Sequence, residues 1–189
     1  MDYFDEVGKK IENLKKHNSI ILDIIEDIYK AYKSDSQILV SGNGGSCSDG
    51  SHFVGELVCT FIDKNRKPIK AIELSSSSAE ITAWSNDFSY STFLERKIET
   101  HGKKGDVAIF LSTSGGDIKK GSTINLVNAC MKAKEKGIIT ISLIGKTGGD
   151  LKNISDKYIL IDSNKTSIIQ ECHMSILHKI CYGIEEKLL

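Results

Sequence analysis

A histidine and a glutamate four positions apart follow a glycine-rich segment in the first third of the chain. His52 and Glu56 would share one face of a helix, because residues four apart lie about one turn from each other. An imidazole next to a carboxylate can shuttle protons or bind a divalent metal ion. The same pair is also a common surface ion pair on helices, so its meaning depends on what surrounds it.

A second group of such residues lies near the C-terminus. The segment IIQECHMSILHKI supplies Gln170, His173 and His178 on an otherwise apolar helical pattern, where a lone histidine is often a core residue. Gln170 and His178 would be ~12 Å apart along a straight helix. They could meet at one point only through long side chains, or with a residue donated by a neighbouring subunit.

Two glycine- and serine-rich segments each follow an apolar run and precede a helical pattern. These are SGNGGS (41–46) and STSGG (112–116). In open parallel sheets, ligands bind beyond the carboxyl ends of the strands. Backbone N–H groups at a helix start, together with serine hydroxyls, can hold a phosphate. Ordinary strand-to-helix turns are the alternative, but two such loops at successive strand ends favour a phosphate site.

Neither loop fits a nucleotide-binding motif. Cys47 stands where the third glycine of G-x-G-x-x-G would be, and no Gly-Lys-Ser/Thr sequence is present. A serine-rich loop without such a lysine suits one phosphate monoester, such as a sugar phosphate, better than a nucleoside triphosphate with magnesium.

The pattern of the rest of the chain predicts an α/β fold. Apolar runs too hydrophobic to face water alternate with helical patterns, which indicates a parallel sheet covered on both faces. The expected strands are 37–41, 68–74, 106–112, 138–144 and 157–162. The expected helices run to about residue 60, around 81–84, and over 92–100, 119–136 and 166–188.

The first 34 residues carry apolar positions at helical spacing. We expect two helices with a break near 17–19, where Asn18 or Ser19 would cap the second, folded as an antiparallel hairpin. The apolar faces of this hairpin need a partner, either the core or another subunit. Residues 1–189 would thus form a single domain, with a helical hairpin (1–34) and an α/β core (35–189).

Bulk composition excludes several classes of function. The 189 residues include 25 Lys+Arg and 25 Asp+Glu, so no net charge favours nucleic acid or an anionic membrane. We expect no membrane-spanning segment and no signal peptide, because the apolar runs are only strand-sized. Five cysteines, an odd number without C-x-x-C, predict reduced thiols in a cytoplasmic protein.

Four segments resemble the sugar isomerase (SIS) domain family, and within it the bacterial phosphoheptose isomerases. They are GNGGS…D…HF…EL (42–57), SNDF (85–88), STSG (112–115) and IQECH…H (169–178). The likeness covers nearly the whole chain. The glycine loop with its His–Glu pair, followed by the late Q-x₇-H, is fairly specific to this branch, whereas STSG is common to the wider superfamily.

This resemblance implies a fold, an assembly and a metal. The fold would be a flavodoxin-like three-layer sandwich, assembled as a homotetramer with active sites at subunit interfaces. One zinc ion per subunit would be held by His52, Glu56, Gln170 and His178.

The resemblance also implies a substrate site and a reaction. The substrate would be a phosphorylated sugar, bound by Asn43, Gly44, Gly45, Ser46, Asp87, Ser112, Thr113, Ser114 and Gln170. The reaction would interconvert sedoheptulose 7-phosphate and D-glycero-D-manno-heptose 7-phosphate, toward the heptose of lipopolysaccharide or capsule. We expect Glu56 to be the base and His178 the acid of this aldose–ketose isomerisation.

Some positions depart from the family pattern. Thr60 and Ile168 stand where arginines are usual, Ser167 stands where Asp or Thr is usual, and Asp117–Gly121 belong to an insertion after STSG. Ser122 or Thr123 would restore the hydroxyl that the insertion displaces. A different phosphosugar therefore stays open as substrate, as does a non-catalytic regulator that binds a phosphosugar or a protein. The complete set of four ligand-type residues favours an enzyme.

Overall fold

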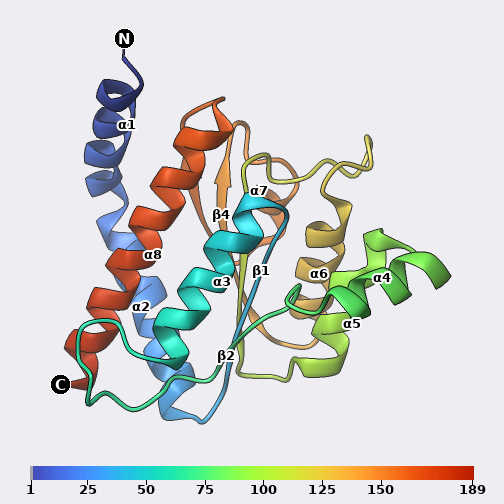
Figure 1. Ribbon diagram of the computed structural model, residues 1–189, viewed down its shortest axis with the longest axis horizontal. Coiled ribbons are helices and arrows are strands. Elements are labelled where there is room, and N and C mark those ends of the chain that lie inside the picture. The colour runs from blue at the N-terminus through green and yellow to red at the C-terminus, as the bar shows by residue number, and fades with distance from the viewer. Residues whose placement is uncertain (1) are drawn as a thin grey trace.

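The computed structural model describes residues 2–189 and contains one five-stranded parallel sheet (Figure 1). The strand order β2-β1-β3-β4-β5 is that of the flavodoxin-like class, which confirms the expected α/β fold. The strands are β1 (Ile38–Gly42), β2 (Ala71–Glu73), β3 (Val107–Ser112), β4 (Ile139–Gly145) and β5 (Lys157–Ile161).

Helices cover both faces of this sheet and form two separate apolar clusters (Figure 1). Alternate strand residues point to opposite faces, so Val40 joins one cluster and Leu39 the other. The first cluster is completed by α2 (Asn18–Lys33), α3 (Gly45–Val58) and α8 (Thr166–Leu188). The second is completed by α4 (Ser78–Asp87), α5 (Tyr90–His101), α6 (Ile124–Glu135) and α7 (Leu151–Ile154).

The N-terminal helices do not form the expected antiparallel hairpin. A 3₁₀ turn, Asn13–His17, joins α1 (Tyr3–Glu12) to α2, and Asn13 and Asn18 keep right-handed helical dihedrals. The chain therefore continues onward instead of reversing, and both helices pack along α8 (Figure 1). The residue preceding α2 is His17, so neither Asn18 nor Ser19 is its N-cap, and His17 makes no side-chain capping bond.

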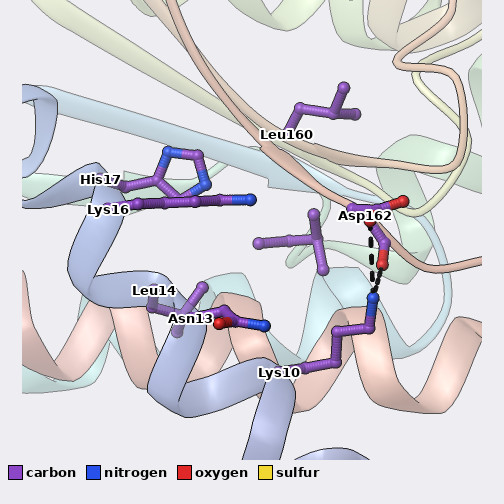
Figure 2. Close-up of a pocket in the computed structure, with 8 residues that line it drawn as sticks. Lys10, Asn13, Leu14, Lys16, His17, Leu160 and Asp162 are labelled. Atoms are coloured by element: carbon purple, nitrogen blue, oxygen red, sulfur yellow. Dashed lines mark hydrogen bonds and ion pairs between the residues drawn. The ribbon is translucent and has the colours of Figure 1, made fainter.

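A small hollow lies beneath the 3₁₀ turn (Figure 2). It measures about 30 Å³, which is the space of one water molecule. The Lys10 ammonium crosses it to the carbonyl and carboxylate oxygens of Asp162. The Lys10–Asp162 contact links α1 to the end of β5, and the hollow itself is too small to hold a sugar.

Element boundaries differ from expectation mainly after β3. The helix expected from residue 119 begins at Ile124, because residues 117–122 form a short hairpin in which Asp117 and Ser122 pair through both backbone groups. Gly116 directly precedes this hairpin and Gly121 lies within it, both with positive φ. Strand β2 has three residues instead of seven, and the four-residue α7 was not expected. No helix within residues 2–189 has the length and hydrophobicity needed to cross a membrane.

The two glycine-rich loops meet at the switch point of the sheet. Strands β1 and β3 are neighbours, with Gly42 opposite Leu111, yet the helices that follow them pack on opposite faces. The connections therefore diverge at the carboxyl edge and leave room between them, the usual place for a ligand in this class of fold.

Candidate active site

The first loop is shaped by glycine. A Cβ atom on Gly42 would come within 2.6 Å of the backbone of Ser46, so only glycine lets helix α3 start this close to the strand. Gly44 has φ of 55°, and the amides of Ser46 and Cys47 bond back to Asn43 and Gly44. The buried Ser46 thus lies in the first turn of α3, where backbone N–H groups and the helix dipole favour an anion.

The second loop is held in shape by Ser112. Its hydroxyl accepts hydrogen bonds from the amides of Ser114 (3.3 Å) and Gly115 (2.9 Å). Gly115 packs so tightly on Gly148 that a Cβ atom there would overlap the carbonyl oxygen of Gly148. Thr113 and Ser114 remain partly exposed at the edge of the loop. Ser112 therefore has a structural task, whereas Ser114 can offer its hydroxyl to a ligand.

Thr123, on the far side of the insertion, returns to this loop. Its hydroxyl oxygen lies 3.5 Å from that of Ser114. Of the two hydroxyls considered from the sequence, Thr123 is therefore the one that lies beside the serine loop. Asp117 accepts a bond from the amide of Lys120 (3.1 Å) and lies 3.6 Å from its ammonium, so its charge is engaged within the hairpin.

A hollow of about 500 Å³ opens beside Ser114 at the ends of β3 and β4. Its size is in the range of small-molecule sites. Three lysines and two aspartates contribute to its wall, which therefore carries a small excess of positive charge: Lys119, Lys120, Lys146, Asp117 and Asp150.

A network of side-chain hydrogen bonds connects the first loop to the starts of α5 and α6. Asn43 and Asn125 exchange hydrogen bonds of 3.0 and 2.8 Å through their side chains, and the Tyr90 hydroxyl donates to the Asn43 oxygen at 2.8 Å. Asn125 is only 2% exposed. The sequence singled out Asn43 but missed Asn125 and Tyr90. A single asparagine among the apolar residues of a first helical turn is the sequence signal that would have pointed to Asn125.

Asp87 lies apart from this network. It is exposed at the end of α4 and accepts a hydrogen bond from the neighbouring Asn86 (2.8 Å). Within residues 2–189, Tyr90 is the residue of this region that contacts Asn43.

A buried carboxylate that the sequence did not reveal lies behind the first loop. Glu73, 4% exposed at the end of β2, accepts bonds from the Ser75 amide (2.8 Å) and the Cys47 thiol (3.5 Å). Burial raises the pKa of Glu73, since its hydrogen bonds only partly offset the loss of water. Burial and the adjacent Glu73 raise the pKa of the Cys47 thiol, so this cysteine stays protonated and unreactive.

The residues with acid–base capacity do come together. The Nε2 atom of His52 lies 3.1 Å from a carboxylate oxygen of Glu56 on α3 and 3.3 Å from Nε2 of His178 on α8. More than 120 residues separate the two helix positions in sequence, and the packing of α3 against α8 unites them. The His52 side chain is 47% exposed and that of Glu56 25%, so the cluster is open to a ligand.

Gln170 lies at a different place from these three side chains. Its amide packs against Gly45, where a Cβ atom would overlap it, seven residues or about 10 Å along α3 from His52. Within the described chain, no hydrogen bond joins Gln170 to His52, Glu56 or His178, and no three His, Cys, Asp or Glu side chains are arranged to hold a metal ion. The expected four-ligand set is therefore assembled only in part.

Two of the positions that depart from the family pattern have clear places in the fold. Ile168, in the first turn of α8, is fully buried in the core, so a charged side chain could not take its place without a change in the packing. Ser167 is exposed in the first turn of α8.

Comparison with known proteins identifies the family. The model of the SIS domain matches residues 2–145. The chain belongs to the SIS domain family. It is 41% identical over 185 residues to a probable phosphoheptose isomerase of Thermoplasma acidophilum, covering 98% of this chain and 97% of that protein. It is 38% identical over 183 residues to a phosphoheptose isomerase of Clostridium acetobutylicum, covering 97% and 90%.

Solved structures of SIS proteins show the same arrangement. Phosphoheptose isomerase GmhA of Neisseria gonorrhoeae matches with a TM-score of 0.88 and 26% identity, over 97% of this chain and 95% of that one. A phosphoheptose isomerase of Francisella tularensis matches with a TM-score of 0.86, also at 26% identity. These comparisons support an aldose–ketose isomerase.

Proposed function

We propose that the protein interconverts sedoheptulose 7-phosphate and D-glycero-D-manno-heptose 7-phosphate. The observation that carries this proposal is that His52 contacts both Glu56 and His178. His52 and Glu56 lie on α3, which starts at the glycine- and serine-rich loop 41–46, and His178 lies on α8. The phosphoheptose isomerases among its relatives, similar over nearly their whole length, support the heptose.

The phosphate would bind between the two loops. The hydroxyls of Ser46, Ser114 and Thr123 would donate to its oxygens near the positive end of the α3 dipole, while Ser112 keeps the second loop in shape. The Asn43–Asn125 pair would bind sugar hydroxyls, with Gly44 and Gly45 leaving the backbone bare for close approach. Asp87 would need to act from its exposed position at the end of α4.

Proton transfer would fall to the helix-borne side chains. The carbonyl moves from C2 to C1 when a base removes a proton from C1 and returns it at C2, while an acid moves protons between O1 and O2. Glu56 would be that base and His178 the acid. His52, in contact with both, holds the two helices in register at this point.

A divalent ion, zinc by the choice of ligands, would be held by His52, Glu56 and His178, one ion per subunit. His52 Nε2 lies 3.1 Å from Glu56 and 3.3 Å from His178, so the three side chains would have to turn to bring their donor atoms around one ion. Gln170 would reach this point only after its amide leaves Gly45. When bound, the ion would stabilise negative charge on the substrate oxygens.

The biological setting also belongs to this proposal. A homotetramer in the cytoplasm, with sites at subunit interfaces, would supply heptose for lipopolysaccharide or capsule. Exposed apolar residues on the N-terminal helices, Phe4 (79%) and Leu22 (59%), support a subunit contact there.

The decisive experiment follows aldose formation from sedoheptulose 7-phosphate by the purified protein, with Glu56→Gln as the matched inactive variant. Turnover by the wild type and loss of turnover in the variant would support the proposal. No turnover of this sugar, with turnover of another phosphorylated ketose, would discard the heptose and keep the reaction.

A further inference from the structure

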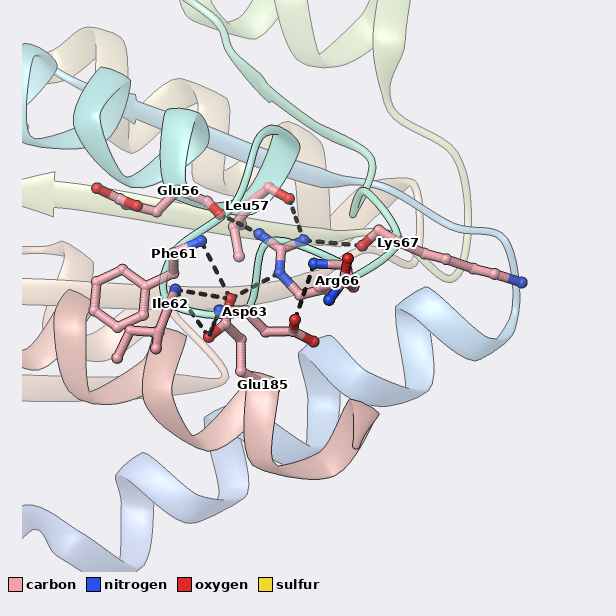
Figure 3. Close-up of polar contacts among 9 residues, drawn as sticks. Glu56, Leu57, Phe61, Ile62, Asp63, Arg66, Lys67 and Glu185 are labelled. Atoms are coloured by element: carbon pink, nitrogen blue, oxygen red, sulfur yellow. Dashed lines mark hydrogen bonds and ion pairs between the residues drawn. The ribbon is translucent and has the colours of Figure 1, made fainter.

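The loop between α3 and β2, residues 59–70, is organised around one buried carboxylate (Figure 3). Glu185, on the last turns of α8, accepts hydrogen bonds from the amides of Phe61 (3.2 Å), Ile62 (3.1 and 3.3 Å) and Asp63 (3.2 Å). Three consecutive N–H groups thus point at one anion. Glu185 is 8% exposed, so few of these bonds are shared with water.

Arg66 completes the charge balance of that carboxylate. Its Nε lies 3.0 Å from Glu185 Oε1, and its side chain is 2% exposed. Burial alone would raise the pKa of Glu185, but the bonds from Asp63, Arg66 and the other loop amides outweigh it and hold the pKa below its usual value. Glu185 is therefore ionised in the folded protein at neutral pH.

The remaining donors of Arg66 bind the end of α3 and the loop itself. Its guanidinium donates to the carbonyls of Leu57 (2.9 Å), Lys67 (2.9 Å) and Glu56 (Figure 3). The carbonyls of a last helical turn have no amide partners within the helix, and a cation there also complements the helix dipole. The backbone of Glu56, whose side chain belongs to the candidate site, is thereby fixed by Arg66.

The same loop places an aromatic ring on the other half of the site. Phe61 stacks on the His178 imidazole with 5.9 Å between ring centroids and 20° between planes. It also meets the edge of Tyr182 at 4.9 Å. His178, Tyr182 and Glu185 lie on successive turns of α8, so the carboxylate that holds the loop also fixes where Phe61 meets the imidazole.

We infer that Arg66 and Glu185 form a positioning pair that sets Glu56 and His178 in register for proton transfer. Arg66 fixes the Glu56 end of α3, and Glu185 fixes the loop that carries Phe61 against His178. This inference rests on the proposed roles of Glu56 and His178. Buried ion pairs often add little net stability compared with apolar replacements, so geometry is the property that such a pair is suited to supply.

The test compares steady-state rates of variants at a temperature where all are folded, checked by circular dichroism. Glu185→Gln keeps the shape and loses the charge, and Arg66→Lys keeps the charge and loses the planar fork. We expect kcat to fall about 10- to 100-fold in each, with KM for sedoheptulose 7-phosphate changed less than about threefold, because displacements near 1 Å have effects of this size.

Phe61 allows a second test, in which a purely structural role of Arg66 and Glu185 would give a different result. Phe61→Leu should lower kcat, and adding Glu185→Gln to it should lower kcat little further, because both changes act on the same imidazole. Asp27→Asn is the matched control. It breaks another partly buried ion pair, with Lys157 between α2 and β5, and should lower the melting temperature while leaving kcat unchanged.

Three outcomes would overturn the inference: wild-type kcat in folded Glu185→Gln, an additive Phe61→Leu/Glu185→Gln double variant, or an equal loss of kcat in Asp27→Asn. Failure of the proposed function looks different, because Glu56→Gln would then retain turnover. An inactive Glu56→Gln together with a fully active Glu185→Gln would reject the positioning pair alone.

Discussion

The two halves of the candidate site are built in opposite ways. The phosphate half lies on loops at neighbouring strand ends, where Ser112 and the glycines fix the backbone locally. The proton-transfer half consists of His52 and Glu56 on α3 and His178 on α8, and His178 joins the other two only because those helices pack. Binding should therefore tolerate small shifts of the helices, whereas turnover should not.

The strongest test of this difference between the two halves removes only the Glu56 carboxylate. Glu56→Gln should lower kcat about 1,000-fold, since general base catalysis typically contributes 10²- to 10⁴-fold, with KM nearly unchanged. The measurement is aldose formation from sedoheptulose 7-phosphate. Glu135→Gln, at the exposed end of α6, is the control and should keep full activity. Near-normal isomerisation by Glu56→Gln would show that the base lies elsewhere.

Acid should weaken the helical half through His173. This residue of α8 is fully buried, and burial lowers its pKa from 6.5 to about 4, an effect that the backbone of Ile144 only partly offsets. The unfolded chain therefore binds the proton first as the pH falls. The resulting loss of stability begins near pH 6.5 and reaches about 3 kcal/mol by about pH 4.

Urea unfolding of His173→Leu over this pH range checks the effect. The variant should lack this part of the pH dependence, and what remains should come from carboxylates such as Glu185, whose stabilisation is lost as the pH falls through its lowered pKa. Parallel curves for wild type and variant between pH 6.5 and 4 would contradict the assignment to His173.

Removing a hydroxyl from the phosphate half should act on binding. Ser114→Ala should raise KM about 10- to 150-fold and change kcat less than about threefold, because a hydrogen bond to a charged group contributes about 1.5–3 kcal/mol. Thr123→Val should have a smaller effect in the same direction. Ser175→Ala, on α8, is the control. A fall in kcat alone for Ser114→Ala would erase the distinction between the two halves.

The smallest expected effect concerns the metal. Dialysis against a chelator should lower kcat about tenfold, and added zinc should restore it, with metal content measured by elemental analysis. The His52→Ala variant should bind less zinc and respond less to the chelator. Full activity of protein shown to be free of metal would separate the ion from catalysis and leave the three side chains as the acid–base group.

Local patterns sufficed to predict most of the fold. The five apolar runs predicted all five strands, and the i, i+4 spacing placed His52 and Glu56 on one helical face, where the structure has them. His178 was also singled out, but its contact with His52 depends on how α8 packs on α3. The N-terminal hairpin was wrong because the dihedrals around Asn13 and Asn18 stay helical, which periodicity does not reveal.

Long-range polar contacts account for most of what the sequence did not reveal. Arg66 and Glu185 are 119 residues apart, and Asn43 and Asn125 are 82 apart. Arg66 and Glu185 look like ordinary surface residues until the chain is folded, and the partner of Asn43 could not be predicted from its neighbours in sequence. The late start of α6 was missed for a local reason, since the helical pattern from residue 119 outweighed the glycines that close the 117–122 hairpin.

The hydrogen-bond network that joins the first loop to α5 and α6 has a consequence for how KM varies with pH. Asparagines do not ionise, and burial, together with the nearby Cys47, raises the pKa of Tyr90, so the wall formed by Asn43, Asn125 and Tyr90 keeps one charge state throughout the physiological range. The second ionisation of a phosphate monoester, near pH 6, has no such protection. An inflection in a plot of log KM around that value would therefore not come from this wall, and the ionisation of the sugar phosphate in solution would contribute to it.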